Sequence, residues 1–110
     1  MEMKELLEFI DWTLSEAGKW TFHHDADRTK KIFAQSVKLS EEVGELSSEV
    51  LWHTGFIRKE KEGRYSPETL QHEFADVILT TIRLAKLMDV DIEMALRNKM
   101  KKIKQRADIQ

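Results

Sequence analysis

Two groups of acidic residues in this 110-residue sequence have the types and spacing that metal-assisted chemistry requires. The first lies in the stretch SEEVGEL and contains Glu41, Glu42 and Glu45, and the second lies in EFAD and contains Glu73 and Asp76. Each group includes two acids three residues apart, a spacing that makes side chains neighbours on one helix face. Four such carboxylates would meet if two helices packed side by side.

The acids of each group border an apolar stripe of the same helix when the residues are placed at about 100° intervals. On the first helix this stripe contains Ile32, Leu39, Val43, Leu46 and Val50. On the second it contains Leu70, Phe74, Val77, Thr81 and Met88. If the helices pack through these stripes as an antiparallel pair, the pattern predicts that four acids converge on one rim: Glu42, Glu45, Glu73 and Asp76.

Such convergence needs a compensating charge. Two carboxylates about 6 Å apart repel by about 3 kcal/mol at an effective dielectric near 20, and four of them make six pairs. A hard divalent cation relieves this repulsion at neutral pH, and an all-carboxylate site suits Mg²⁺ or Mn²⁺ rather than zinc. The alternative is a solvated helix face, where like charges cost only about 0.2–0.5 kcal/mol per pair. Geometry alone leaves both interpretations open.

The elements that would position these acids are helices. Four glycines and one proline leave few places for turns. Ser66 and Pro67 form a typical helix start, with a capping side chain before proline at the first helical position. The pattern predicts an all-α fold of about four helices in one domain, 1–110, with helices from Met3 to about Ala17, from Ala26 or Arg28 to Trp52, from Pro67 to about Met88, and from Asp91, as the cap, to about Arg106.

Composition narrows the class of protein. Hydrophobic residues make up 41% and charged residues 35% of the chain, which is typical of globular proteins. The net charge of −2 argues against a nucleic-acid or membrane-surface binder. The sequence contains no cysteine and therefore no thiolate ligand or nucleophile. The N-terminal stretch lacks the continuous apolar region of a signal peptide, so we expect a cytoplasmic protein that interacts with no membrane.

The third predicted helix is apolar around much of its circumference. Only Asp76, Arg83 and Lys86 are charged between Phe74 and Met88, and Ile78 and Ile82 point away from the main stripe. A helix of this kind is usually buried on several sides. We therefore expect a homo-oligomer, and the alternative is one wide core face.

The two acidic groups resemble a known signature. EEVGEL followed by EFADVILTTIRLA is similar to the EExxE…ExxD motif of MazG-like nucleoside triphosphate pyrophosphohydrolases, which belong to the all-α NTP pyrophosphatase superfamily. Between Glu45 and Glu73 lie 27 residues, within the spread of that superfamily. The resemblance extends from about Trp20 to Arg106 and includes the segment DVDIEMALRNKM.

The resemblance implies a reaction and a set of site residues. Members of this family cleave nucleoside triphosphates between the α and β phosphates with Mg²⁺, which Mn²⁺ can replace, and release a monophosphate and pyrophosphate. Glu42, Glu45, Glu73 and Asp76 match the metal ligands. Glu41, together with Glu42 and Glu45, matches the catalytic acids, and its own role is to orient a ligand or to activate water. The implied physiological role is removal of unwanted nucleotides.

The resemblance also implies contacts to the substrate. The residues that match the family's phosphate-binding positions are Lys38, Lys99 and Arg106. Those that match its base-binding positions are Trp20, Phe22, His23, Trp52 and Asn98. The sequence departs from the family here, because family members often carry an asparagine after the lysine, whereas Asn98 precedes Lys99. For the aromatic residues, ordinary packing is the alternative interpretation. Relatives form dimers or tetramers with pockets built partly by a neighbouring subunit.

Other functions remain open at this point. Within the superfamily, a phosphoribosyl-ATP pyrophosphohydrolase or a dUTPase-like activity is an alternative, and the sequence does not reveal the preferred nucleotide. Outside it, a helical interaction module without catalysis is a second alternative. A di-iron bundle is disfavoured because it needs Glu-x-x-His, and no histidine here has a glutamate three positions before it.

Overall fold

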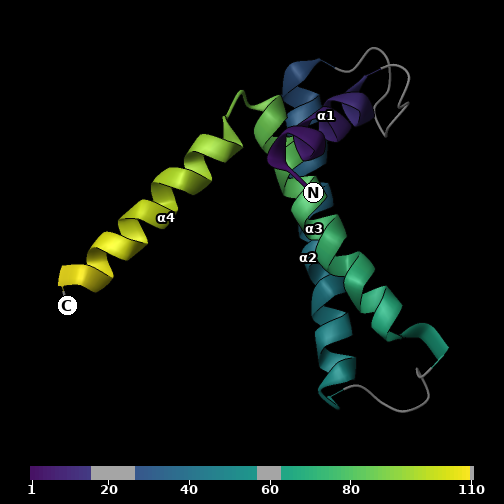
Figure 1. Ribbon diagram of the computed structural model, residues 1–110. Coiled ribbons are helices and arrows are strands. Elements are labelled where there is room, and N and C mark those ends of the chain that lie inside the picture. The colour runs from purple at the N-terminus through teal and green to yellow at the C-terminus, as the bar shows by residue number, and fades with distance from the viewer. Residues whose placement is uncertain (16–26, 57–62, 110) are drawn as a thin grey trace.

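The computed structural model describes residues 1–15, 27–56 and 63–109. Within these ranges the chain forms helices only, which are α1 (Met3–Leu14), α2 (Arg28–His53), α3 (Pro67–Leu87) and α4 (Ile92–Ile109). Helices α2 and α3 run antiparallel as a long hairpin, α1 lies across one end of it, and α4 projects away from that same end (Figure 1). The predicted all-α class with four helices is confirmed for the described residues.

The starts of three helices are fixed by capping side chains, of which Ser66 and Asp91 were predicted. The backbone N–H of Lys30 donates to Asp27 Oδ1 at 2.9 Å, and the N–H of Met94 donates to Asp91 Oδ1 at 3.0 Å. At the start of α3, Ser66 and Thr69 form a reciprocal capping box ahead of the first turn. These local interactions explain why the starts of the helices were predictable.

The ends of α1 and α4 differ from the prediction. Helix α1 stops at Leu14 instead of Ala17, because Ser15 adopts an extended backbone and both its N–H and its hydroxyl donate to the carbonyl of Trp12. Helix α4 continues past Arg106 to Ile109.

A tight connection joins α3 to α4. Asp89 has a φ of 57°, in the left-handed region that ends many helices. The Asp89 N–H donates to Lys86 O at 3.1 Å and the Val90 N–H donates to Ala85 O at 2.9 Å, which is the Schellman pattern. The Asp89 carboxylate also accepts from Arg28 at the start of α2, at 3.2 Å. The connection is therefore held to the hairpin at both helices.

The contact between α2 and α3 includes buried polar residues as well as part of the predicted apolar stripes. Gln35, Glu42 and Glu49 are seven residues apart, lie on one face of α2 and are its buried residues. Gln35 Nε2 donates to the backbone carbonyl of Thr80, which is also buried, at 3.3 Å. Part of the predicted stripes is half-buried beside this acidic face, namely Ile32, Leu39 and Leu46 of α2 and Leu70 and Val77 of α3.

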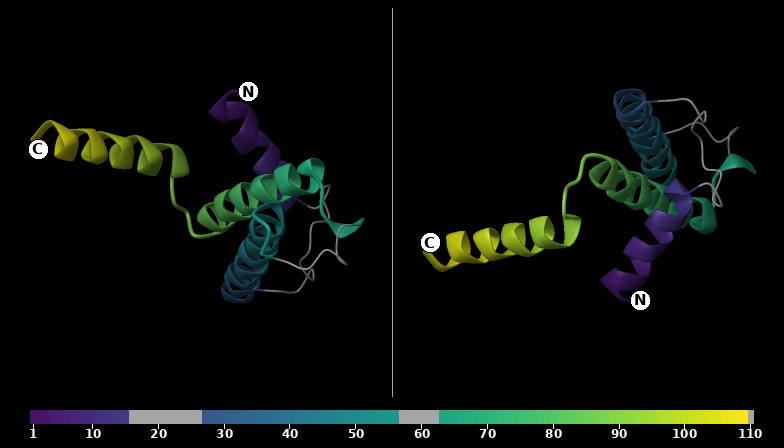
Figure 2. Two further views of the ribbon diagram at one scale, coloured as in Figure 1. Left: turned by 90° about the horizontal axis from the view of Figure 1, so that it is seen from below. Right: turned by 90° about the horizontal axis from the view of Figure 1, so that it is seen from above.

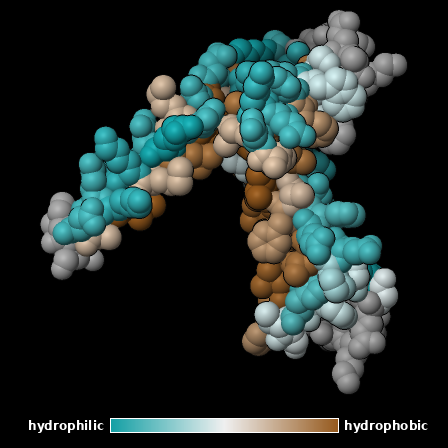
Figure 3. Space-filling view, viewed as in Figure 1, coloured by the Kyte–Doolittle hydropathy of each residue, from teal (hydrophilic) through white to brown (hydrophobic). Residues whose placement is uncertain are grey.

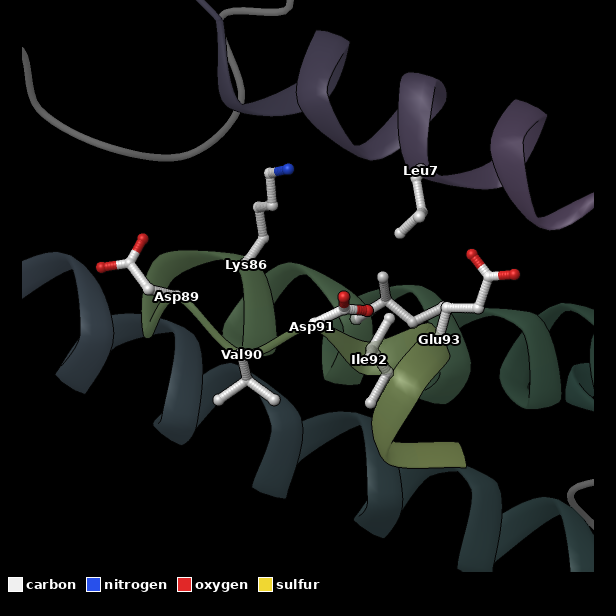
Figure 4. A pocket seen from close by; sticks show the side chains of 8 residues that line it. Leu7, Lys86, Asp89, Val90, Asp91, Ile92 and Glu93 are labelled. Atoms are coloured by element: carbon white, nitrogen blue, oxygen red, sulfur yellow. The ribbon is translucent and has the colours of Figure 1, made fainter. Parts of the chain in front are cut away.

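Helix α1 packs against the end of the hairpin and closes a small core. Ile10 and Ile82 are the buried hydrophobic residues of the described chain. Lys86 Nζ pairs with Asp11 of α1 at 3.1 Å. A groove of about 410 Å³ remains between α1 and the start of α4, with Leu7 facing Ile92 across it (Figure 4).

Much of the apolar surface of this chain is exposed. Helix α4 lies apart from the hairpin in all views (Figure 2), and hydrophobic residues line both its inner side and the facing edge of the hairpin (Figure 3). Ile78 is exposed, as expected from the sequence, whereas Ile82 is buried in the groove it shares with Leu7 of α1. The other exposed apolar residues include Phe33, Val37, Val43 and Val50 of α2, Phe74 of α3, and Leu96, Met100 and Ile103 of α4.

The cap of α3 leads to a first prediction. Ser66→Ala removes the acceptor of the Thr69 N–H, so we expect the free energy of unfolding to fall by about 1 kcal/mol. Ser47→Ala is the matched control, because Ser47 is exposed in the middle of α2 and bonds only the preceding turn at Val43. Urea denaturation of both variants checks this, and an equal loss in the two would contradict the role of the cap.

Candidate functional site

Three carboxylates from the α2–α3 hairpin meet at one place. Glu42 of α2 and Glu73 and Asp76 of α3 each offer an oxygen, and these oxygens lie within 4.8 Å of one another. The antiparallel packing brings the two acidic groups together because each group repeats at helical spacing on the face turned toward the other helix. Full charges at that separation repel by about 3 kcal/mol per pair at an effective dielectric near 20.

Part of this cluster is buried without a partner. Glu42 is 6% exposed, and Lys38 Nζ lies 3.3 Å from its Oε1 atom. The Oε2 atoms of Glu42 and Glu73 are buried and accept no hydrogen bond from the described residues. Leaving such an oxygen unsatisfied costs free energy. These two atoms therefore point to a positively charged group that completes the cluster.

Proximity and burial change the acidity of the cluster. Burial, followed by the charge of Glu45 and a hydrogen bond with it, raises the pKa of Glu73 to about 7. Burial and the charge of Glu42 also raise the pKa of Asp76. The side-chain hydrogen bond to Glu42 raises the pKa of Lys38. Without a cation, Glu73 is therefore partly protonated near neutral pH.

The remaining acids of the first group lie at the edge of the cluster. Glu45 is exposed, contacts Glu73, and lies outside the group of three closest carboxylates. Glu41 is also exposed, and its carboxylate lies 3.6 Å from Lys38 Nζ. Lys38 thus bridges Glu41 and Glu42 beside the cluster.

Arg83 is a neighbour of the cluster that the sequence analysis did not select. It is 3% exposed, and its Nε atom donates to Thr13 Oγ1 of α1 at 3.1 Å. Burial lowers the pKa of Arg83, and the charges of Asp76 and Glu42 oppose that shift. One signal was available, since Arg83 is among the few charges of α3 and lies about two turns after Asp76.

A groove of about 290 Å³ begins at Glu45 and Glu73 and runs toward the far end of the hairpin. Its other lining residues, which the sequence analysis also did not select, are Ser48, Glu49, Arg64 and Tyr65. The ring of Tyr65 stacks on that of Trp52, with centroids 5.6 Å apart and planes 21° from parallel. Trp52, predicted to contact a base, therefore lies directly behind the wall of a groove that contains two of the predicted acids.

The predicted substrate residues of α4 do not lie near the acids of this chain (Figure 2). Asn98, Lys99 and Arg106 are exposed on α4, which projects away from the hairpin (Figure 2). Trp20, Phe22 and His23 lie outside the described residues.

The donor set of the cluster fits a hard divalent cation. All three closest side chains supply carboxylate oxygens, and two buried oxygens still need a partner. Mg²⁺ and Mn²⁺ prefer such ligands and retain several waters that substrate oxygens can replace. The arrangement can therefore hold a cation at one end of an open groove.

Comparison with protein families identifies the chain. The model of the MazG nucleotide pyrophosphohydrolase domain matches residues 33–109, which include both acidic groups and α4. The chain belongs to the MazG family, and the resemblance seen in the sequence is confirmed. Family membership supports nucleotide pyrophosphohydrolase activity as the general class.

Other comparisons add no relative. Neither the search of curated proteins nor that of solved structures gave a match to this chain. Of the helices that the structure describes, none is both long enough and apolar enough to cross a bilayer.

The acidity of Glu73 predicts how the stability of the metal-free protein depends on pH. Between about 4.5 and about 7, the folded protein binds more protons than the unfolded chain, because folding raises the pKa of Glu73. The free energy of unfolding should therefore be highest at the acidic end of this window and fall as the pH rises through it. Thermal unfolding in the presence of a chelator measures this trend.

Two controls assign the trend to the cluster. Glu73→Gln should flatten the dependence on pH across this window, and Mg²⁺ added above pH 7 should raise the Tm of the native protein but not of the variant. The same slope in both proteins would show that other groups cause it.

Proposed function

We propose that this protein hydrolyses nucleoside triphosphates between the α and β phosphates, with Mg²⁺, to a nucleoside monophosphate and pyrophosphate. The observation that carries the proposal is the cluster of Glu42, Glu73 and Asp76, whose oxygens lie within 4.8 Å inside the region that matches the family model. The buried, unpartnered oxygens of Glu42 and Glu73 support a cation at that place.

The acids have different proposed roles, which follow from their positions. Glu42, Glu73 and Asp76 would hold the cation, with Glu45 joining them from the mouth of the groove. When bound, Mg²⁺ supplies charge neutralisation for the phosphates and makes water a better nucleophile. Glu45 and Glu41 are exposed and can accept the proton that water loses as it attacks phosphorus. The bond to the bridging oxygen then breaks and pyrophosphate leaves.

Lys38 is the cation of this chain placed to contact the phosphates from beside the acids. Its Nζ atom is paired with Glu41 and Glu42 and is partly open to solvent. An ammonium there balances both the acids and the incoming phosphates as a compact point charge. Trp52 would support the base at the other end of the groove. We propose that Trp20, Phe22 and His23 also contact the base.

The working form in this proposal is a homo-oligomer, a dimer or a tetramer. Exposed apolar residues lie on α2, α3 and α4, and apolar surface of this kind often marks an interface between subunits. Lys99, Arg106 and Asn98 lie on the arm that projects from the hairpin. In an oligomer that arm packs on a second copy, which brings these side chains to the neighbour's groove, where they contact phosphate and base.

The proposal extends to the setting of the reaction. Residues 1–110 act as one domain in the cytoplasm, where the enzyme removes unwanted nucleotides from the pool. A panel of nucleotides tests this, because a housecleaning enzyme favours particular bases or sugars.

The reaction itself gives the next prediction. Incubation with Mg²⁺ and a panel of NTPs and dNTPs should release pyrophosphate and a monophosphate, and a chelator should abolish the release. Glu45→Gln should lower turnover by about a hundredfold or more while the protein stays folded, because this exposed acid contacts Glu73 at the cluster. Pyrophosphate and orthophosphate are assayed separately.

Glu8→Gln is the control for that variant. Glu8 lies on α1 with its side chain 67% exposed and pairs only weakly with Lys4 at 4.0 Å, so the same loss of charge should leave turnover unchanged. Release of orthophosphate alone would contradict the proposed bond cleavage. Release of neither product from any nucleotide would favour a non-catalytic module.

The proposed assembly gives a separate prediction. The native chain should have a solution mass that is a multiple of 13.0 kDa, measured by light scattering after gel filtration. Met100→Glu places a charge in the exposed apolar stripe of α4 and should shift the mass toward that of the monomer. Gln105→Glu adds the same charge on another face of α4 and should not. A native monomer would contradict the assembly.

A further inference from the structure

Glu49 is a buried carboxylate that the proposed reaction does not use. It is 4% exposed and lines the groove that starts at Glu45 and Glu73. It lies seven residues after Glu42 on the same face of α2, which is about 10 Å along the helix axis at 1.5 Å per residue. That separation is comparable to the distance from the 5′ phosphate of a nucleotide to the far edge of its base.

The side chain of Glu49 is held in place by His53. Their Oε2 and Nε2 atoms lie 3.2 Å apart. Because an ionised carboxylate only accepts hydrogen bonds, the imidazole N–H is the donor. A carboxylate has about four acceptor sites, so this bond leaves most of the capacity of Glu49 free. Burying a charged acceptor is costly unless further donors reach it, and the groove is the side from which a ligand can bring them.

The groove also offers an aromatic surface beside this acceptor. Tyr65 lines it and is backed by Trp52, which stacks on it at 5.6 Å. The ring of Trp52 in turn contacts that of His53 edge to face, with centroids 4.9 Å apart. Any planar base could stack on this surface. Stacking would therefore contribute affinity without selecting a base, and the carboxylate of Glu49 would make the selection.

We propose that Glu49 selects the base of the substrate, accepting hydrogen bonds from the amino group of cytosine, adenine or guanine and disfavouring uracil and thymine. This inference rests on the proposed function, because it assumes that the groove beside the acids binds a nucleotide. Glutamate accepting from the cytosine N4 amino group is a known pairing in nucleic-acid recognition. Guanine is the best match, since its ring N–H and its amino group lie side by side.

Uracil and thymine lack the required pattern of donors. Their pairing edge carries one N–H between two carbonyl oxygens, and a carboxylate placed opposite that edge faces at least one of those oxygens. The result is repulsion between acceptors together with an unsatisfied buried charge. Sites built to hydrogen-bond a substrate group reject analogues that lack it for this reason.

A second cation is not the favoured partner of Glu49. Among the residues the structure describes, the group able to hold a metal consists of Glu42, Glu73 and Asp76 and does not include Glu49. Among the described residues, the ring of His53 lies against Glu49 and the guanidinium of Arg64 lies on the groove wall.

The test compares nucleotides that differ at one position of the base. For dCTP against dUTP, the native enzyme should favour dCTP in kcat/KM by about tenfold to a hundredfold, the worth of a hydrogen bond to a charged group. Glu49→Gln replaces the carboxylate by an amide that both donates and accepts, so the ratio should fall to within about threefold. Glu8→Gln should keep the native ratio.

A binding measurement without turnover separates this inference from the proposed reaction. Calorimetric titration of the native protein with dCMP and dUMP, and with GMP and IMP, should show tighter binding of the nucleotide that carries the amino group. If no triphosphate is hydrolysed but this binding preference is present, the proposed hydrolysis would be wrong and the proposed base selection would stand.

The opposite pattern overturns the inference alone. Hydrolysis with equal use of dCTP and dUTP, equal or absent binding of the paired monophosphates, or an unchanged preference in Glu49→Gln would each remove Glu49 from base selection. The monophosphate pairs need only the native protein, so the inference remains testable if the variant does not fold.

Discussion

The structure depends on one electrostatic constraint, which is the burial of carboxylates between two helices. Most helix pairs are held together by apolar side chains, but here the inner face of α2 carries Glu42 and Glu49. The charge of Glu42 is balanced by Lys38 at 3.3 Å, and Glu49 is paired with the ring of His53 at 3.2 Å. For the cluster of Glu42, Glu73 and Asp76, this balance is incomplete, because two buried oxygens still have no partner within the described chain. The protein thus holds a strongly anionic place ready for a cation.

The burial of acids between α2 and α3 affects the apolar residues on the outer faces of the hairpin. Because the acids occupy the contact between α2 and α3, apolar residues such as Val43 and Phe74 are left partly in water. Within the described residues of one chain, the fully buried apolar side chains are those of Ile10 and Ile82, so the hydrophobic effect contributes less there than in a typical core. The polar interior of the hairpin and the association that we propose are therefore two results of the same arrangement.

Local features of this fold could be read from the sequence, and features that depend on the packing of helices could not. Ser66 and Asp91 cap helices through contacts within one turn, so residue type and position were sufficient to predict them. The convergence of the two acidic groups followed from their periodicity. Periodicity does not say which residues of a helix face become fully buried, and for this reason the burial of Gln35, Glu42 and Glu49 beside the half-buried stripe was not expected.

The neighbours of the site were missed for a similar reason. Arg83, Glu49 and Tyr65 gain their importance from elements distant in sequence: Arg83 from Thr13 of α1, and Tyr65 from its stacking on Trp52. On a helix taken alone, Glu49 is one more acid. Only the partner helix and the groove distinguish it from the solvated acids of the surface.

The short connection after α3 has a mechanical consequence. With Asp89 in the left-handed conformation and paired with Arg28, the short connection sets the direction in which α4 leaves the hairpin, so that α4 acts as a lever arm. In the proposed assembly, the distance between one catalytic centre and the next would then depend on the backbone geometry of the few residues that join α3 to α4. A small change in the backbone at Asp89 would move the far end of α4 by several times as much.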